Sequence, residues 1–195
     1  MSHIEDWARR RRFLAVALAL PFASRVLAAE DVPLTPACGD KPEQTPSQTA
    51  GPFYTPDSPR RASLVEPGST AERLVLAGFV LSPQCRPVAN ALLDFWHCDE
   101  AGTYDNRGFR YRGHLFTDAQ GRYSLESIVP GEYPGRTRHI HVKVQAPRER
   151  ILTTQLYFPD EPGNRSDGIY RRELAMRIAR ARDRRDARFD FVVAA

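Results

Sequence analysis

The pattern that decides the fold of this chain lies in Tyr133-Pro134-Gly135-Arg136-Thr137-Arg138-His139-Ile140-His141-Val142-Lys143-Val144. Its second half is β-branched and apolar, except that His139 and His141 stand two positions apart. Side chains at positions i and i+2 of a strand point to the same face of a sheet. The two imidazoles can therefore approach one metal ion, although a His-x-His pair by itself also fits an ordinary polar sheet face.

Short apolar segments of the same kind recur along the chain, with turn residues between them at 82–84, 117–121 and 130–131. Many short strands separated by turns predict an all-β fold, an antiparallel β-sandwich with short helical or loop additions. One segment, residues 171–183, has a helix-like composition. The predicted strands cover residues 74–81, 91–96, 122–125, 139–145, 153–158 and 188–193.

The first 29 residues have the features of an export signal peptide. Arginines at 9–12 precede a short apolar run at 13–23, and small residues follow near position 28. The apolar run is shorter than the roughly 20 residues that span a bilayer. Arg10-Arg11-Arg12-Phe13-Leu14 fits the twin-arginine form, with an ordinary Sec signal as the alternative. We therefore expect an exported protein, periplasmic or secreted, with no stable membrane span once the signal is removed.

Three segments are predicted: the signal at 1–29, an extended leader at 30–50 rich in Pro, Thr, Gln and Ser, and a sandwich domain at 51–195. The signal holds five arginines and two acids, so its removal lowers the formal net charge from +4 to +1. The high isoelectric point thus partly belongs to the signal. No basic patch remains that would predict a nucleic-acid partner.

The three cysteines are Cys38, Cys85 and Cys98. An exported protein can keep a disulfide, and an odd count leaves one thiol over. A straight strand of about eight residues would hold Cys85 and Cys98 roughly 26 Å apart, whereas bridged Cα atoms lie within about 7 Å. We predict a Cys38–Cys85 bond with Cys98 as a buried thiol near Tyr104, and three unpaired thiols as the alternative.

Two tyrosines, Tyr104 and Tyr133, can join the two histidines as metal ligands. Phenol has a pKa of about 10, so only a strongly Lewis-acidic ion keeps it deprotonated at neutral pH. Fe(III) suits such a mixed oxygen and imidazole set, whereas zinc sites favour Cys, His and carboxylates. Each tyrosine also has a structural interpretation, Tyr104 as a surface loop residue and Tyr133 as a packing residue.

Six segments match, in order, those of one known enzyme family. They are Gly51-Pro52-Phe53-Tyr54, Leu93-Asp94-Phe95-Trp96-His97-Cys98-Asp99-Glu100-Ala101-Gly102-Thr103-Tyr104, Phe116-Thr117-Asp118-x-x-Gly121-x-Tyr123, Pro130-Gly131-Glu132-Tyr133-Pro134, Arg136-x-x-His139-Ile140-His141 and Thr154-Gln155-Leu156-Tyr157-Phe158. Through them the chain resembles the intradiol ring-cleavage dioxygenases, the family of catechol 1,2-dioxygenase and protocatechuate 3,4-dioxygenase. The resemblance spans roughly residues 50–193.

The resemblance implies a non-haem Fe(III) enzyme that inserts both atoms of O₂ into a catechol-type ring and releases a muconate-type diacid. Tyr133 matches the ligand that the catechol displaces, and it can then take a substrate proton. Arg136 matches the partner of negative charge on the substrate, and Gln155 can donate a hydrogen bond to the substrate. The implied iron ligands are Tyr104, Tyr133, His139 and His141.

Short connections set this chain apart from the larger enzymes. Only six positions separate Tyr133 from His139, and the loop from Tyr104 to Thr117 is also short. We therefore expect a more open pocket, and the particular catechol stays open, as does homo-oligomer formation. Two alternatives remain: a non-catalytic sandwich that binds polysaccharide or protein, and an iron-binding relative without ring cleavage.

Overall fold

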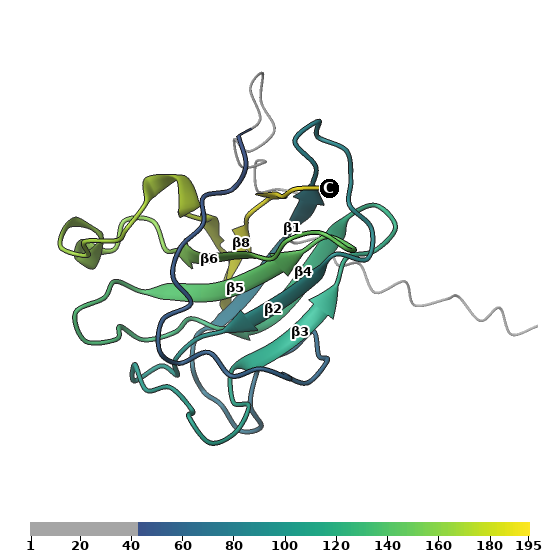
Figure 1. The fold of residues 1–195 in the computed structure, drawn as a ribbon. Helices are drawn as coiled ribbons and strands as arrows, with labels where there is room; N and C mark the ends of the chain where they lie inside the picture. Colours follow the sequence, from purple (N-terminus) through teal and green to yellow (C-terminus); the bar gives the residue numbers. More distant parts are fainter. Residues whose placement is uncertain (1–42) are drawn as a thin grey trace, which may run out of the picture.

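The structure is a computed structural model that describes residues 43–195 (Figure 1). The predicted signal peptide and much of the predicted leader lie outside these residues. The described part contains nine strands in two sheets and two short 3-10 helices, η2 (Pro162–Arg165) and η3 (Arg172–Leu174). The all-β prediction is therefore confirmed.

One sheet has four strands in the order β3-β2-β5-β6, and all neighbouring pairs are antiparallel. It ends at one side in β3, which the sequence did not predict. In sheet order the strands are β3 (Arg112–Phe116), β2 (Leu92–Trp96), β5 (His139–Gln145) and β6 (Leu152–Tyr157).

The second sheet has five strands, in the order β4-β1-β8-β7 with β9 also paired to β1. It is mixed, and not antiparallel throughout as predicted from the sequence, because β1 runs parallel to β8 and to β9. A parallel pair needs a long connection, and here the four-stranded sheet and β4 lie between β1 and β8 in the chain. The strands are β4 (Arg122–Ile128), β1 (Arg73–Leu81), β8 (Arg184–Arg188), β7 (Arg177–Arg180) and β9 (Phe191–Val192).

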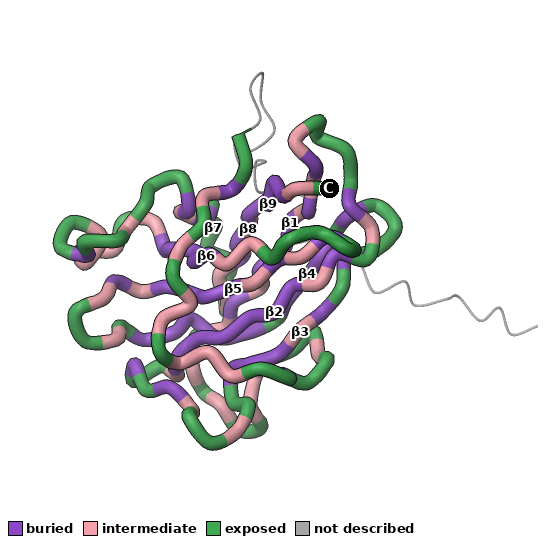
Figure 2. The backbone as a smooth tube through the Cα atoms, viewed as in Figure 1, coloured by how far each residue is buried: buried purple, intermediate pink, exposed green. Residues whose placement is uncertain are grey.

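The core lies between the two sheets, where apolar side chains of both sheets are buried (Figure 2). In β5 the inward residues are Ile140, Val142 and Val144, all fully buried. The alternation turns His139 and His141 to the opposite face, away from the second sheet. The period-two pattern in β5 thus fixes where the histidines point.

The helix-like segment 171–183 is not an α-helix. It forms η3 and then the edge strand β7. Leu174 and Met176 are buried and Ile178 packs partly against the core. Apolar side chains at every second position are typical of a strand with one buried face. Burial of these three residues outweighs the helix propensity of the Arg- and Ala-rich sequence around them.

The predicted C-terminal strand 188–193 is also wrong as one unit. β8 ends at Arg188 and β9 begins at Phe191. Between them the Asp190 carboxylate accepts a hydrogen bond of 2.9 Å from the Phe79 N–H. A side chain here replaces a backbone acceptor, which interrupts the ladder.

Gly78 in β1 lies where the chain passes against Phe189. A Cβ atom at position 78 would stand 1.8 Å from the Phe189 carbonyl oxygen. We expect Gly78→Ala to lower the free energy of unfolding by about 3 kcal/mol, the upper range for overpacking. The control is Gly168→Ala, whose Cβ would meet no atom within 4 Å, with an expected change within about 0.5 kcal/mol. Urea unfolding of both variants measures this, and equal stability would contradict it.

An N-terminal segment, residues 45–58, runs across the outer face of the four-stranded sheet (Figure 1). The Gln48 N–H donates to the Thr153 carbonyl at 2.8 Å, and the Thr154 hydroxyl donates to the Pro46 carbonyl at 2.7 Å. The Gln155 amide donates to the Thr49 carbonyl at 2.9 Å. This covering segment (residues 45–58) encloses the face that carries the histidines, although the predicted boundary at residue 51 stays a prediction.

Candidate metal centre

The candidate residues meet at one end of the four-stranded sheet. Strand register places Arg112, Trp96, His141 and Gln155 in one row across β3, β2, β5 and β6. Residues directly opposite one another on paired strands project from the same face. The row therefore lies on the outer face, under the covering segment.

The two imidazoles converge through their Nε2 atoms, which are 3.1 Å apart. His139 Nδ1 lies 2.6 Å from the Thr137 carbonyl oxygen, so this nitrogen is the donor. The ring of His141 stacks on Trp96, with centroids 4.8 Å apart and planes 5° from parallel. Both rings are thus held in orientation by neighbours before any ligand binds.

Tyr104 completes a three-donor cluster, because its hydroxyl oxygen is 3.4 Å from His139 Nε2. Phe53 of the covering segment stacks on Tyr104 with a centroid distance of 4.4 Å. Tyr133 meets both rings edge-on, at 5.9 Å from Tyr104 and 5.2 Å from Phe53. The structure therefore gathers all four predicted ligands, with Tyr133 half-buried at the rim.

Two glycines join the loops that carry the tyrosines. A Cβ at Gly102 would lie 2.2 Å from the Glu132 carbonyl oxygen, and one at Gly131 would lie 2.5 Å from the backbone of Glu100. Gly102 also has φ of +82°, which favours glycine. The motifs that contain Tyr104 and Tyr133 thus pack backbone to backbone, and this contact sets the spacing of the two rings.

Arg136 links the centre to the end of β6. Its Nη2 donates to the Gln155 side-chain oxygen at 2.7 Å, and its Nε donates to Asp167 at 2.9 Å. The Thr137 and Ile169 N–H groups also donate to Asp167. Although burial opposes it, these backbone donors and the guanidinium lower the pKa of Asp167. A charged carboxylate therefore orients Arg136 beside Gln155.

Arg138, which the spacing allowed on the same face as Arg136, has a different environment. It pairs with Glu161 at 3.2 Å, donates to the Pro130 carbonyl and lies over the Phe158 ring. Assigning the site role to Arg136 is therefore consistent with its own contacts to Gln155 and Asp167.

Burial sets the protonation of the donors. It lowers the pKa of His139 to about 4 and that of His141 well below its ordinary value. Both imidazoles are neutral at neutral pH, as a metal ligand must be. Burial raises the pKa of Tyr104, since it disfavours the charged phenolate. Forming a tyrosinate here therefore requires a nearby cation.

The donor set fits a metal ion. His139 Nδ1 donates to a carbonyl, so its Nε2 carries a lone pair directed at the Nε2 of His141. Two metal–imidazole bonds of about 2.1 Å at a right angle would leave the nitrogens about 3 Å apart. The His141 Nδ1 is buried and has no hydrogen-bond partner among residues 43–195. A cation that accepts both Nε2 lone pairs suits this arrangement.

The cysteine prediction is confirmed for one residue. Cys98 is a free, buried thiol that donates to the Gly131 carbonyl at 3.4 Å and packs with Trp96 and Tyr104. Cys85 is disulfide-bonded. Cys38 lies outside the described residues, so the predicted Cys38–Cys85 pairing stays a prediction.

Several contributors were not singled out from the sequence. Arg112 is 1% exposed and donates to the carbonyls of Phe53, at 2.6 Å, and Asp105, at 2.7 Å. It therefore fastens the covering segment to the loop after Tyr104. The sequence did not predict β3 around Arg112 and Gly113, because glycine and arginine there do not form the β-branched pattern of a strand. The role of Asp167 was not predicted from the sequence either, because this residue is far from the His-x-His motif in sequence.

Residues 43–195 contain no group of three or more His, Cys, Asp or Glu side chains placed to bind a metal. Within the same residues no helix is long and apolar enough to cross a membrane.

Comparison with known proteins identifies relatives over most of the described part. The sequence model of a family described as Dioxygenase matches residues 49–195. Catechol 1,2-dioxygenase of Candida albicans is 31% identical over 159 residues, which are 67% of this chain and 52% of that protein. The chain spans about half the length of the first curated relatives it matches.

Several solved structures share the fold, among them two dioxygenases at different sequence identities. One is the dioxygenase domain of a dioxygenase carbohydrate-binding protein fusion from Streptomyces sp. SirexAA-E, at 49% identity and a TM-score of 0.77, covering 78% of this chain and 99% of that one. The other is 3-chlorocatechol 1,2-dioxygenase of Rhodococcus opacus 1CP, at 25% identity and a TM-score of 0.72, covering 77% and 72%.

An all-β protein that gathers two imidazoles and two phenols at one end of a sheet is a candidate non-haem metalloprotein. The match over residues 49–195 and the catechol 1,2-dioxygenase relative show that this chain belongs to the dioxygenase family. The resemblance to the intradiol ring-cleavage enzymes is thereby confirmed.

Proposed function

We propose that this protein is a non-haem Fe(III) intradiol dioxygenase that opens a catechol-type ring between its two hydroxylated carbons and yields a muconate-type diacid. The observation that carries the proposal is that His139 Nε2 lies 3.1 Å from His141 Nε2 and 3.4 Å from the Tyr104 hydroxyl oxygen. Tyr133 is the fourth ligand in this proposal.

The bound iron would supply Lewis acidity, which draws electron density from a catecholate ring and makes the ring reactive toward O₂. The protein's own part is positioning and charge. Tyr133, half-buried at the rim, would hold the metal as a phenolate, and this phenolate could take a proton from the incoming catechol. The Arg136 guanidinium faces negative charge that develops on the substrate, and Gln155, held by Arg136 and Thr49, keeps its amide beside His141.

A surface hollow adjoins two of these groups, Tyr133 and Arg136. This hollow of about 390 Å³ is lined by Tyr133, Arg136, Thr137, Gly163 and others. Tyr133 and Arg136, the two proposed substrate-contacting residues, are partly exposed at this hollow. We therefore propose that a catechol enters from this side and reaches the donors past Tyr133.

The test is iron content, colour and oxygen uptake of the purified protein. We expect about one iron per chain, a burgundy colour from tyrosinate-to-Fe(III) charge transfer, and a hue change on adding catechol. Catechol, protocatechuate and 3-chlorocatechol should each be assayed for one O₂ consumed per ring opened. Stoichiometric zinc in a colourless protein would overturn the iron site. Iron and colour without O₂ uptake from any catechol would instead indicate a relative that has lost ring cleavage.

We also propose that the protein is exported. The disulfide at Cys85 supports this, because such bonds persist in oxidising compartments. The signal at 1–29 lies outside the described residues. Fractionation of the native host checks the proposal, and protein that remains in the cytoplasm with an intact N-terminus would contradict it.

A further inference from the structure

Positive charge is concentrated in one C-terminal segment. Residues 171–188 contain eight arginines against Glu173, Asp183 and Asp186, a net charge of +5. The whole chain has a net charge of +4, so all its other residues together have a net charge of −1. The small net charge expected for the exported protein predicts that no basic patch remains; this prediction is wrong for residues 171–188, which are strongly basic.

The fold places these arginines on the hairpin β7–β8. β7 is at the end of its sheet order, so the side away from β8 has no strand partner among the described residues. Register pairs Arg177 with Arg188 and Arg180 with Arg185. Like charges directly opposite one another destabilise a hairpin, so this arrangement is explained poorly by the stability of the fold alone.

The hairpin arginines differ in how far carboxylates neutralise them. Arg184 pairs with Asp186 at 2.8 Å, and Arg185 with Glu72 at 2.8 Å. Arg177, Arg180 and Arg182 are exposed and form no ion pair within residues 43–195. Arg177 and Arg180 lie on β7 and, being three positions apart, point to opposite faces of the sheet, whereas Arg182 lies in the turn before β8. The three guanidinium groups therefore surround the open edge of the hairpin and are available to an anionic partner that runs along it.

The remaining residues of the hairpin restrict the kind of partner. Residues 177–188 contain no aromatic side chain that could stack on a nucleic-acid base. Their one large apolar side chain, Ile178, packs against the core and is not available to insert into a membrane. The geometry suits an extended polymer whose anionic groups pair with guanidinium and whose hydroxyls pair with edge backbone groups.

We propose that the arginine hairpin (residues 177–188) binds a carboxylate-bearing polysaccharide. Guanidinium pairs with a carboxylate through two parallel hydrogen bonds, and sugar hydroxyls can both donate to and accept from the open edge of β7. This surface is formed by the five-stranded sheet, whereas the candidate metal centre lies on the other sheet. Binding would hold the protein at an acidic polymer without using the centre.

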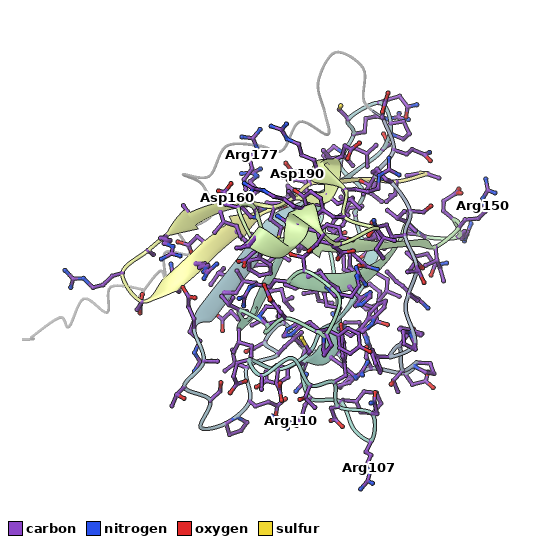
Figure 3. All side chains as sticks on the ribbon, turned by 90° about the vertical axis from the view of Figure 1, so that its left-hand side faces the viewer. Arg107, Arg110, Arg150, Asp160, Arg177 and Asp190 are labelled. Atoms are coloured by element: carbon purple, nitrogen blue, oxygen red, sulfur yellow. The ribbon has the colours of Figure 1, made fainter. Side chains whose placement is uncertain are left out.

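The test compares two triple variants of the full protein on immobilised polygalacturonate at low ionic strength. The first is Arg177→Gln/Arg180→Gln/Arg182→Gln. The matched control is Arg107→Gln/Arg110→Gln/Arg150→Gln, which removes the same charge from exposed sites on other sides of the molecule (Figure 3). Exposed ion pairs are individually weak, so the hairpin variant should bind about tenfold more weakly. The control should stay within about twofold of the wild type, and all binding should fall with added salt.

Each other outcome overturns the proposal. Unchanged binding by the hairpin variant would show that the arginine hairpin is not the binding surface. An equal loss of binding in the control would show only an effect of net charge. Tighter binding to duplex DNA or to phosphatidylglycerol vesicles than to polygalacturonate would show that the partner is not a polysaccharide. Oxygen uptake with catechol is measured in parallel, and it should be the same in both variants, so failure here is separate from failure of the proposed activity.

Discussion

Replacing His141 with alanine is expected to remove iron and colour while leaving the β-sandwich folded. His141 presents its Nε2 to the Nε2 of His139 at 3.1 Å and is 3% exposed. Changing a residue that merely supports a metal ligand costs about 10–100-fold in affinity, so loss of a ligand should exceed about 100-fold. Iron analysis and the visible spectrum of protein matured in its native host measure this directly.

The fold should tolerate this change, because the core side chains of β5 come from the other face. Loss of the Trp96 stack should lower the free energy of unfolding by about 1 kcal/mol. His114→Ala is the matched control: His114 is on the same sheet face but contacts Ser58, at 2.7 Å. Full iron occupancy in the His141 variant, or equal iron loss in both variants, would show that the assignment is wrong.

The sequence predicted the parts of this protein that depend on local periodicity. Alternation through Ile140, Val142 and Val144 gave both the strand and the outward direction of His139 and His141, and the structure has β5 at those positions. The two tyrosines were found only because the motifs around them resemble a known family. Nothing in the spacing of Tyr104 alone separates a ligand from a surface loop residue.

What the sequence could not show depends on contacts between distant segments. The segment 45–58 has few apolar residues and no periodicity, yet its Phe53 ring stacks on Tyr104. Arg112 is buried because three carbonyl contacts, one to Phe53 and two to Asp105, replace water around its guanidinium. Such a residue is predicted to be exposed from composition, and only the assembled fold reveals its partners.

The mistaken helix at 171–183 has a related cause. Arginine and alanine favour helices, and they outnumber the apolar residues that alternate at 174, 176 and 178. Burial of those three side chains decides the local structure. The same arginines then project from a strand rather than a helix, which brings them together as the arginine hairpin.

Replacing Arg136 with alanine is expected to lower kcat with catechol by about 100- to 1,000-fold while iron and colour remain. Removing one preorganised group that meets charge in the transition state costs about this much. Arg136 contacts Gln155 and Asp167 and not the histidines, so metal binding should be little affected. Because the charge develops mainly during reaction, kcat should fall much more than KM rises.

The matched control for this experiment is Arg138→Ala. Arg138 is two residues away and equally charged, but it pairs with Glu161 and lies over Phe158. Its removal should leave kcat within about threefold, which converts to less than 1 kcal/mol. Arg136→Lys should recover part of the rate, since it restores charge without the planar fork that spans Asp167 and Gln155. Wild-type turnover in Arg136→Ala, or an equal loss in both alanine variants, would reject the role of Arg136, whereas loss of iron would show that Arg136 instead supports the ligands.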